Sequence, residues 1–287
     1  MKQLAIVAPW KPMDIWFLGD FQWAGKKSQS TALDRLKHTI EDALEAEKHG
    51  REVRFIGMGD YIDFASPSNR ARLKSSNLYD TATDIIDDKA LELTDEVGDI
   101  LAPTEGKWLG LVEGHHFHEL KDGTTTDMRL CERLKATFLG TTGLVRLGFK
   151  TPGHYKARIS VVIWVHHGTG NGQTGYYPLT RLEKKSAEWE QVDVFAMGHT
   201  TKMVTEFQNK VYPRWSPALD LSHRKVILMG TGGYSKAYVL GAMQGRIPRG
   251  GYAEQRMLNA AIIGSPVLHV RPRIYEGHVS VDLTAEG

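Results

Sequence analysis

The chain lacks several features that mark specialised classes of protein. Its 287 residues include one cysteine, Cys131, which excludes an intrachain disulfide framework and a cysteine-cluster metal site. No apolar run approaches the ~20 residues that span a bilayer. The segment Met1–Lys11 has neither a long apolar core nor a cleavage site, so we expect no signal peptide. We therefore expect a cytoplasmic protein without a membrane partner.

An excess of charge of one sign is also missing. The 36 basic and 34 acidic residues leave a net charge of +2, so no global field recruits nucleic acid. The composition, 41% hydrophobic and 24% charged, is that of an ordinary globular protein. No internal repeat, low-complexity tract or linker interrupts the chain. We expect a single domain over residues 1–287.

What the chain does have is histidine and aspartate at the ends of short apolar runs. The stretch Val161–Gly172 begins as an apolar run and stops at two of the twelve histidines, before a glycine-rich turn. Four more apolar runs end in a side chain that can bind a metal: FLGD (17–20), FIGMGD (55–60), LGLVEGHH (109–116) and VFAMGH (194–199). Such strand ends deliver side chains to the sheet edge where α/β proteins place their chemistry.

Strand and helix periods alternate along the chain. Strands over 14–20 and 52–58 flank a helix over Thr31–Gly50, a unit that implies parallel pairing with a right-handed crossover. Further helices are expected at 81–101, 124–138 and 179–190, and further strands at 107–112, 143–154, 159–165 and 192–197. Residues 66–80 read as a polar loop with some helix. Short strands at 204–212, 225–229, 267–271 and 278–283 are expected to form a second sheet.

Aspartates and imidazoles that converge at one sheet edge would bind a divalent transition metal. Mixed carboxylate and imidazole ligation suits Mn, Zn, Fe or Co rather than Ca. A shared carboxylate can bridge two ions roughly 3.5–4 Å apart, the spacing of a two-metal phosphoester site. A neighbouring imidazolium can protonate the leaving oxygen.

The order of the motifs resembles that of the calcineurin-like metallophosphoesterases. The matching stretches are GDFQ (19–22), GDYID (59–63), EGHH (113–116), HHG (166–168) and GHTT (198–201). The resemblance runs from about residue 14 to residue 202, and the later strands fit the family's second sheet. It implies an α/β fold, a four-layer α/β/β/α sandwich of two mixed β-sheets flanked by helices.

The resemblance also implies a role for each matched position. Asp20 resembles a ligand of the first metal, and Asp60 resembles the carboxylate that bridges both metals. His166 and His199 resemble ligands of the second metal. His116 resembles the general acid, or the imidazole that orients the phosphate.

Three positions depart from the family's pattern. Gln22 and Thr201 stand where histidines are usual, and both losses fall on the first metal site, where Gln22 offers only a weak amide oxygen. His115 stands where asparagine is usual, and it would strengthen the second site beside Asp60. The sequence thus predicts one firmly held ion and a second that is weak, absent or completed by the substrate.

Several neighbours are candidates for supporting roles near the substrate or the ligands, Thr201 among them. His167 competes with His166 as a ligand, and we favour His166 because it directly follows the predicted strand. Asp63 would either orient an imidazole or cap a turn. Trp23 and Tyr61 flank ligand positions and would wall a pocket.

Two further segments have a functional and a plain interpretation. The glycine-rich residues 168–177 would contact phosphate through backbone N–H groups, or would simply connect two elements. The basic residues Arg70, Arg72 and Lys74 would hold a phosphate backbone, although such runs are more often a solvated face.

We therefore expect a metal-dependent phosphoesterase with one or two divalent ions. A phosphodiester, nuclease-like or small, is slightly favoured over a phosphomonoester, because poor retention of one ion harms attack on a dianion more. Nucleic acid and nucleotides are among the candidate substrates. The alternatives are a metal-dependent hydrolase of a non-phosphate ester and a lapsed binding or scaffold module. Idle buried polar clusters are costly to keep, which counts against the scaffold.

Overall fold

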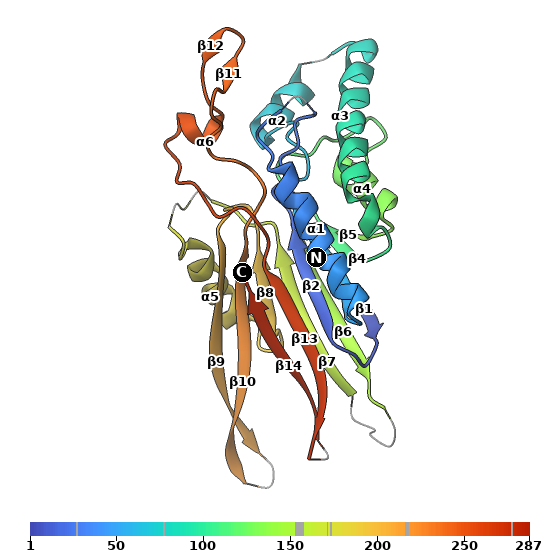
Figure 1. Cartoon of the computed structure of the whole chain (residues 1–287), viewed down its shortest axis with the longest axis vertical. Coiled ribbons are helices and arrows are strands. Elements are labelled where there is room, and N and C mark those ends of the chain that lie inside the picture. Colours follow the sequence, from blue (N-terminus) through green and yellow to red (C-terminus); the bar gives the residue numbers. More distant parts are fainter. Residues whose placement is uncertain are drawn as a thin grey trace.

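The structure, a computed structural model, describes residues 1–26, 28–76, 78–152, 158–170, 172, 174–215, 218–276 and 278–287. Two six-stranded mixed β-sheets pack against each other, and helices cover their outer faces (Figure 1). Helices hold 27% of the residues and strands hold 38%. The predicted sandwich of two mixed sheets flanked by helices is confirmed.

The first sheet has the strand order β14-β13-β2-β3-β4-β5. Its strands are β2 (Met13–Leu18), β3 (Glu52–Gly57), β4 (Trp108–Val112), β5 (Thr137–Gly140), β13 (Val267–Tyr275) and β14 (His278–Glu286). β2 to β5 run parallel, and β13 pairs antiparallel with β2. The parallel pairing of β2 and β3 is the one that the strand–helix–strand pattern predicted.

The second sheet has the strand order β1-β6-β7-β8-β10-β9. Its strands are β1 (Lys2–Ala8), β6 (Thr142–Lys150), β7 (Arg158–His166), β8 (Val194–Met197), β9 (Met203–Trp215) and β10 (Leu219–Thr231). β7, β8 and β10 run parallel to one another. The expectation that four late strands share a sheet is wrong, because β9 and β10 extend this sheet whereas β13 and β14 extend the first.

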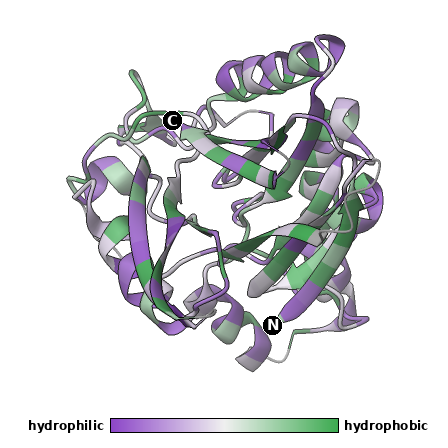
Figure 2. Cartoon of the chain, turned by 90° about the horizontal axis from the view of Figure 1, so that it is seen from below, coloured by the Kyte–Doolittle hydropathy of each residue, from purple (hydrophilic) through white to green (hydrophobic). Residues whose placement is uncertain are grey.

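Amphipathic helices cover both sheets. α1 (Leu33–Lys48), α3 (Asp80–Leu101) and α4 (Thr126–Leu134) pack on the first sheet, and α5 (Tyr177–Glu188) packs on the second. In Figure 2 the helical ribbons carry both hydrophilic and hydrophobic residues, as helices with one buried face do. No helix in the described part of the chain is long and apolar enough to cross a membrane.

One predicted boundary differs from the structure. The helix expected over 124–138 ends at Leu134, because Lys135 takes a left-handed φ of 54° and its N–H bonds to carbonyls of the last turn. β5 then follows. The segment 66–80, expected to be a polar loop with some helix, contains the helix α2 (Pro67–Ser75), which Ser66 caps through Asn69 N–H. The remaining short elements are η1 (Ala102–Thr104), β11 (Met243–Gln244), β12 (Ile247–Pro248) and α6 (Tyr252–Gln255).

The core consists of three apolar layers. The central layer lies between the sheets and includes Ile15, Phe17, Ile163 and Val165, none of them more than marginally exposed. The outer layers join α1, α3 and α4 to the first sheet and α5 to the second. β2, β3, β7 and β8 are therefore buried on both faces, and polar side chains find room only beyond their ends.

Candidate metal centre

The side chains that could hold a metal gather where five parallel strands end. Asp20, Asp60 and His115 follow β2, β3 and β4 of the first sheet, whereas His167 and His199 follow β7 and β8 of the second. One ligand atom from each of His115, His167 and His199 lies within 4.8 Å of the others, and the same holds for Asp20, Asp60 and His167. Both sheets thus contribute to one cluster, in which His167 belongs to both groups.

The backbone of this region is unusually left-handed. Among the described residues, eight that are not glycine have positive φ, and five of these belong to the predicted site. They are Asp20, Gln22, Asp60, His199 and Thr201, with φ between 46° and 66°. Such conformations are costly for side chains with a Cβ and concentrate at functional sites.

Glycine permits the closest approach in the cluster. A Cβ on Gly114 would collide with the backbone nitrogen of Asp60. Gly59, with φ +91°, leaves room for the imidazole of His167, since a Cβ there would lie 2.5 Å from Nδ1. Gly114 therefore lets two loops of the first sheet meet, and Gly59 lets a loop of the first sheet meet His167 of the second.

Each buried carboxylate keeps one oxygen free. Asp20 Oδ2 accepts the His199 N–H at 2.9 Å, and Asp60 Oδ1 accepts the N–H groups of His115 and His116, the latter at 3.0 Å. Asp20 Oδ1 and Asp60 Oδ2 are buried and make no hydrogen bond within the described residues. Asp60 Oδ2 does lie 3.3 Å from His167 Nε2, an ionic contact without hydrogen-bond alignment. Buried anionic oxygens in this state call for a cation.

The imidazoles aim their free nitrogens at the same point. His167 Nδ1 donates to the Met58 carbonyl at 2.6 Å, which leaves Nε2 as the atom that faces the cluster. His199 Nδ1 lies 3.2 Å from both His167 Nε2 and His115 Nδ1. A ring nitrogen offers either one N–H or one lone pair, so His199 Nδ1 can make a full hydrogen bond to only one of these two neighbours, whereas all three nitrogens could direct lone pairs at one cation.

The pKa values show the same demand. Burial, with the charge of Asp60, raises the pKa of Asp20 to about 7. Burial opposes ionisation of Asp60, yet the His167 charge and hydrogen bonds hold its pKa well below the ordinary value. Burial disfavours the charged form of His167, but the charge of Asp60 outweighs it and raises that pKa to about 9. Burial lowers the pKa of His115 to about 4 and also lowers the pKa of His199. In the metal-free chain, His167 supplies the missing positive charge.

This donor set fits a divalent transition metal. Asp60, His115, His167 and His199 offer one carboxylate and three imidazoles, and Asp20 adds a second carboxylate. Oxygen and imidazole donors in this ratio suit Zn, Mn, Fe or Co. The two free carboxylate oxygens are the observation that favours a metal over a purely structural cluster.

The choice of His166 as ligand is corrected by the structure. His166 is the last residue of β7, and its ring stacks on Trp164 at 5.6 Å, on the face that α5 covers. Its Nδ1 accepts the Gly168 N–H at 2.6 Å. Because side chains alternate along a strand, His167 instead follows Ile163 and Val165 into the space between the sheets, where it is 1% exposed.

Gln22 and Thr201 lie beside the cluster without adding a strong donor. The Gln22 Oε1 atom accepts the Ser235 hydroxyl at 3.0 Å, so its ligand oxygen is engaged. Asp20 and Thr201 both lie against Gly233, in the segment after β10. Ser235 was not among the predicted residues. The signal for it was present, because β10 is one more buried strand that ends in a Thr-Gly-Gly turn.

His116 stands at the rim with a carboxylate behind it. Its Nδ1 lies 2.8 Å from Asp63 Oδ1, and this hydrogen bond raises the pKa of His116. Nε2 makes no hydrogen bond within the described residues.

A second carboxylate, Asp127, was missed by sequence reasoning because it lies inside a helix. It is buried, accepts the Gly114 N–H at 3.0 Å, and burial raises its pKa to about 7.

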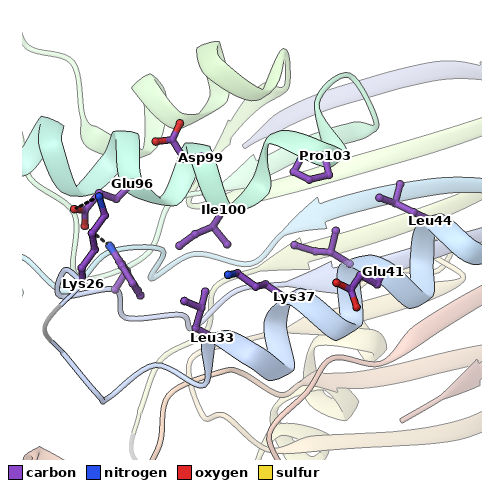
Figure 3. Close-up of a pocket in the computed structure, with 11 residues that line it drawn as sticks. Lys26, Leu33, Lys37, Glu41, Leu44, Glu96, Asp99, Ile100 and Pro103 are labelled. Atoms are coloured by element: carbon purple, nitrogen blue, oxygen red, sulfur yellow. Dashed lines mark hydrogen bonds and ion pairs between the residues drawn. The ribbon is translucent and has the colours of Figure 1, made fainter.

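Trp23 and Tyr61 do not wall the site. Tyr61 is 1% exposed in the layer beneath α1 and α3, and its hydroxyl donates to the Val112 carbonyl at 2.9 Å. The Trp23 indole donates to Glu96 at 2.7 Å. It lines a separate cavity of about 560 Å³ between α1 and α3, where Leu33, Lys37 and Ile100 also lie (Figure 3). Both rings therefore serve the helix-facing side of the sheet.

No protein-family model matches the chain, and no curated protein matches it. Among solved structures it is similar to a Vps29 single mutant from Entamoeba histolytica, with 14% identity, 96% of this chain and 100% of that chain covered, and a TM-score of 0.33. It is also similar to Vacuolar Protein Sorting 29 from Cryptosporidium parvum, with 11% identity, 96% of this chain and 98% of that chain covered, and a TM-score of 0.32. A third similar structure is sulfate thiohydrolase SoxB from Thermus thermophilus, with 9% identity, 98% of this chain and 57% of that chain covered, and a TM-score of 0.35. TM-scores this low assign neither family nor function.

Proposed function

We propose that this chain is a metal-dependent hydrolase of phosphoesters. The observation that supports it best is the meeting, at the ends of five strands from two sheets, of three imidazoles and two carboxylates with free buried oxygens. Within this cluster His115 and His199 are half-buried, whereas Asp20, Asp60 and His167 are buried, so the side of those two histidines is the accessible one. A substrate phosphoryl group would approach from there.

Numbered by how firmly they would be held, which reverses the family's numbering used above, Asp60, His115, His167 and His199 would hold the first ion, and Asp20 with Asp60 would hold the second. The chemistry that a divalent transition metal supplies when bound is to lower the pKa of water and to neutralise phosphoryl oxygens. The protein's part is to hold these ligands in place: the Met58 carbonyl fixes His167, and two N–H groups fix Asp60.

His116 would act as the general acid. Asp63 holds its Nδ1 and raises its pKa, so Nε2 keeps a proton nearer to neutral pH. That proton would pass to the leaving oxygen as the ester bond breaks. Asp63 itself is half exposed and would be an orienting group, not a proton carrier.

The preferred substrate is a phosphodiester. Gln22 shares its oxygen with Ser235, and Thr201 has no ring nitrogen, so the second ion is held by two carboxylates and little else. A single well-held ion suits a monoanionic diester better than a dianionic monoester.

The two adjacent histidines provide a matched test. His167→Asn keeps a donor for the Met58 carbonyl but removes Nε2, whereas His166→Asn keeps an acceptor for Gly168 N–H on the other face. We expect His167→Asn to lose bound metal and to lower kcat/KM for bis(p-nitrophenyl) phosphate by more than about 100-fold. This is a larger loss than the removal of a residue that only orients a metal ligand causes. His166→Asn should behave as the wild type. Metal content by mass spectrometry and rates with Mn, Zn, Fe and Co are the measurements.

Three results would contradict the proposal in different ways. Wild-type protein that binds none of these metals would favour a binding module. Hydrolysis of carboxyl esters alone would favour another metal hydrolase. Hydrolysis of p-nitrophenyl phosphate without the diester would overturn the preference for diesters only.

A further inference from the structure

Helix α2 (Pro67–Ser75) is attached to the protein in an unusual way. None of its residues is buried, so apolar packing contributes little to its position. Arg70 and Leu73 are its half-buried residues, whereas Arg72 is exposed. The basic run at 70–74 is therefore not a uniform solvated face.

Arg70 donates to backbone carbonyls of the segment that carries the site histidines. Its Nη1 lies 2.6 Å from the Ala65 carbonyl oxygen, 2.5 Å from that of His115 and 3.2 Å from that of Phe117. The guanidinium carbon is 3.8 Å from the centre of the Phe117 ring. All three acceptors are neutral, so the positive charge is not spent on a carboxylate contact.

One peptide group links this cation to the metal centre. The carbonyl of His115 accepts from Arg70, and the N–H of His116, in the same peptide unit, donates to Asp60 Oδ1 at 3.0 Å. In a planar trans peptide the C=O and N–H point in opposite directions, so the unit spans cation and anion in a line. Charges at both ends polarise the group and strengthen both hydrogen bonds.

The segment is also tied from its other side. The N–H groups of Phe64 and Ala65 both reach the His116 carbonyl at 3.3 Å. Arg70 and this pair together fix the carbonyls of His115, His116 and Phe117. The directions in which the His115 and His116 side chains leave the backbone follow from that.

We propose that Arg70 is a positioning residue of the metal centre: through the His115–His116 peptide it sets the orientation of the His115 ligand and of the His116 acid. The effect of Arg70 on catalysis rests on the proposed function, whereas its effect on the orientation of the His115–His116 peptide can be tested without it. Arg70 acts through the backbone and makes no contact with substrate in this role.

The test compares Arg70→Gln and Arg70→Lys with Arg72→Gln, a charge removal two residues away on the exposed side of the same helix. In the metal-free chain, exchange of the His115 and His116 amide protons, measured by NMR, should accelerate roughly 10- to 100-fold in Arg70→Gln. The lysine variant should lie between, since it keeps the positive charge but its nitrogen lies one bond closer to the backbone and it lacks the planar guanidinium. Arg72→Gln should exchange as the wild type.

The same variants separate positioning from substrate contact. Arg70→Gln should weaken Mn²⁺ binding by about 10- to 100-fold and lower kcat with little change in KM. A rise in KM with metal affinity and amide exchange unchanged would show that Arg70 binds substrate instead, and equal behaviour of the Arg70 and Arg72 variants would show no role. If the amides respond as expected while the wild type hydrolyses no phosphoester, the positioning role stands and the proposed function fails.

Discussion

β2 has a buried aspartate near each end, and the protein treats the two in opposite ways. Asp14 receives two hydrogen bonds from Arg51, and His269 Nδ1 lies 2.5 Å from its Oδ1. Burial would raise its pKa, but His269 and Arg51 lower it. Asp20, at the other end, has a free buried oxygen, and burial raises its pKa to about 7. Burial alone therefore does not distinguish structure from function.

The difference lies in who supplies the positive charge. Asp14 has a permanent cation of the chain itself, because an arginine stays charged at every relevant pH. The cationic neighbours of Asp20 are imidazoles, chiefly that of His167 and also that of His116, and the His167 ring also serves Asp60. A carboxylate left without a permanent partner at the carboxyl end of a parallel sheet is a candidate ligand for the ion that we propose.

Neutralising each aspartate breaks this comparison most directly. Asp14→Asn should lower the free energy of unfolding by about 3 kcal/mol, because it leaves Arg51 without its carboxylate in a mostly buried site. Its folded fraction should retain the wild-type kcat. Asp20→Asn should leave the metal-free chain at least as stable as the wild type and abolish most hydrolysis. Urea unfolding and rates with bis(p-nitrophenyl) phosphate measure both.

A reversed pattern would refute this assignment of roles. Specifically, Asp20→Asn that destabilises the metal-free chain as much as Asp14→Asn would make Asp20 a structural residue.

The pH dependence of stability should differ in sign at the two ends. Asp14 has a lowered pKa, so its contribution is present above the unfolded value of 3.8 and is lost as pH falls. Asp20 has a raised pKa, so the folded metal-free chain binds the proton more tightly and loses stability as pH rises from 3.8 to about 7. This loss is at most about 1.4 kcal/mol per pH unit.

Unfolding of the metal-free chain at about pH 5 and about pH 6.5 measures this effect, before the raised pKa of His167 adds its own decline up to about 9. The decline should flatten in Asp20→Asn and persist in Asp14→Asn. An unchanged decline in Asp20→Asn would assign it to another group.

The smallest expected effect concerns the second ion. Gln22→His replaces an amide oxygen engaged by Ser235 with an imidazole beside Asp20 and Asp60. We expect it to raise the bound metal from about one to about two ions per chain at saturating Mn²⁺. Ser235→Ala, which only frees the Gln22 oxygen, should raise it less. Metal titration followed by calorimetry gives the count, and two ions already in the wild type would show that Gln22 suffices.

Much of the fold followed from local patterns. The helix expected over Thr31–Gly50 is α1, and Leu36, Ile40 and Ala43 are among the residues of its buried stripe. The short apolar runs became the central parallel strands. The pairing of the late strands did not follow, because β9, β10, β13 and β14 are similar in sequence pattern and only contacts between distant strands sort them into two sheets.

Much of the candidate site also followed from local patterns. Asp20, Asp60, His115, His116 and His199 each follow a strand in the sequence, and the structure brings them to one place. The sequence predicted that side chains alternate between the two faces of β7, but not which of the two faces points toward the other sheet. Both faces of that strand are apolar, one against the other sheet and one against α5, so the sequence pattern is the same whichever way the strand is turned.

By itself the sequence determined which chemical groups stand at the carboxyl ends of buried strands, since apolar runs and the turns that end them are local properties. The tertiary structure decided which of two adjacent histidines faces inward, that Trp23 belongs to the helix-facing cavity, and that Arg70 turns in toward the His115 carbonyl. These outcomes depend on the packing of segments that are far apart in the chain. Which side chain meets a given carbonyl or carboxylate oxygen is decided by their positions in space, and the local sequence does not contain that information.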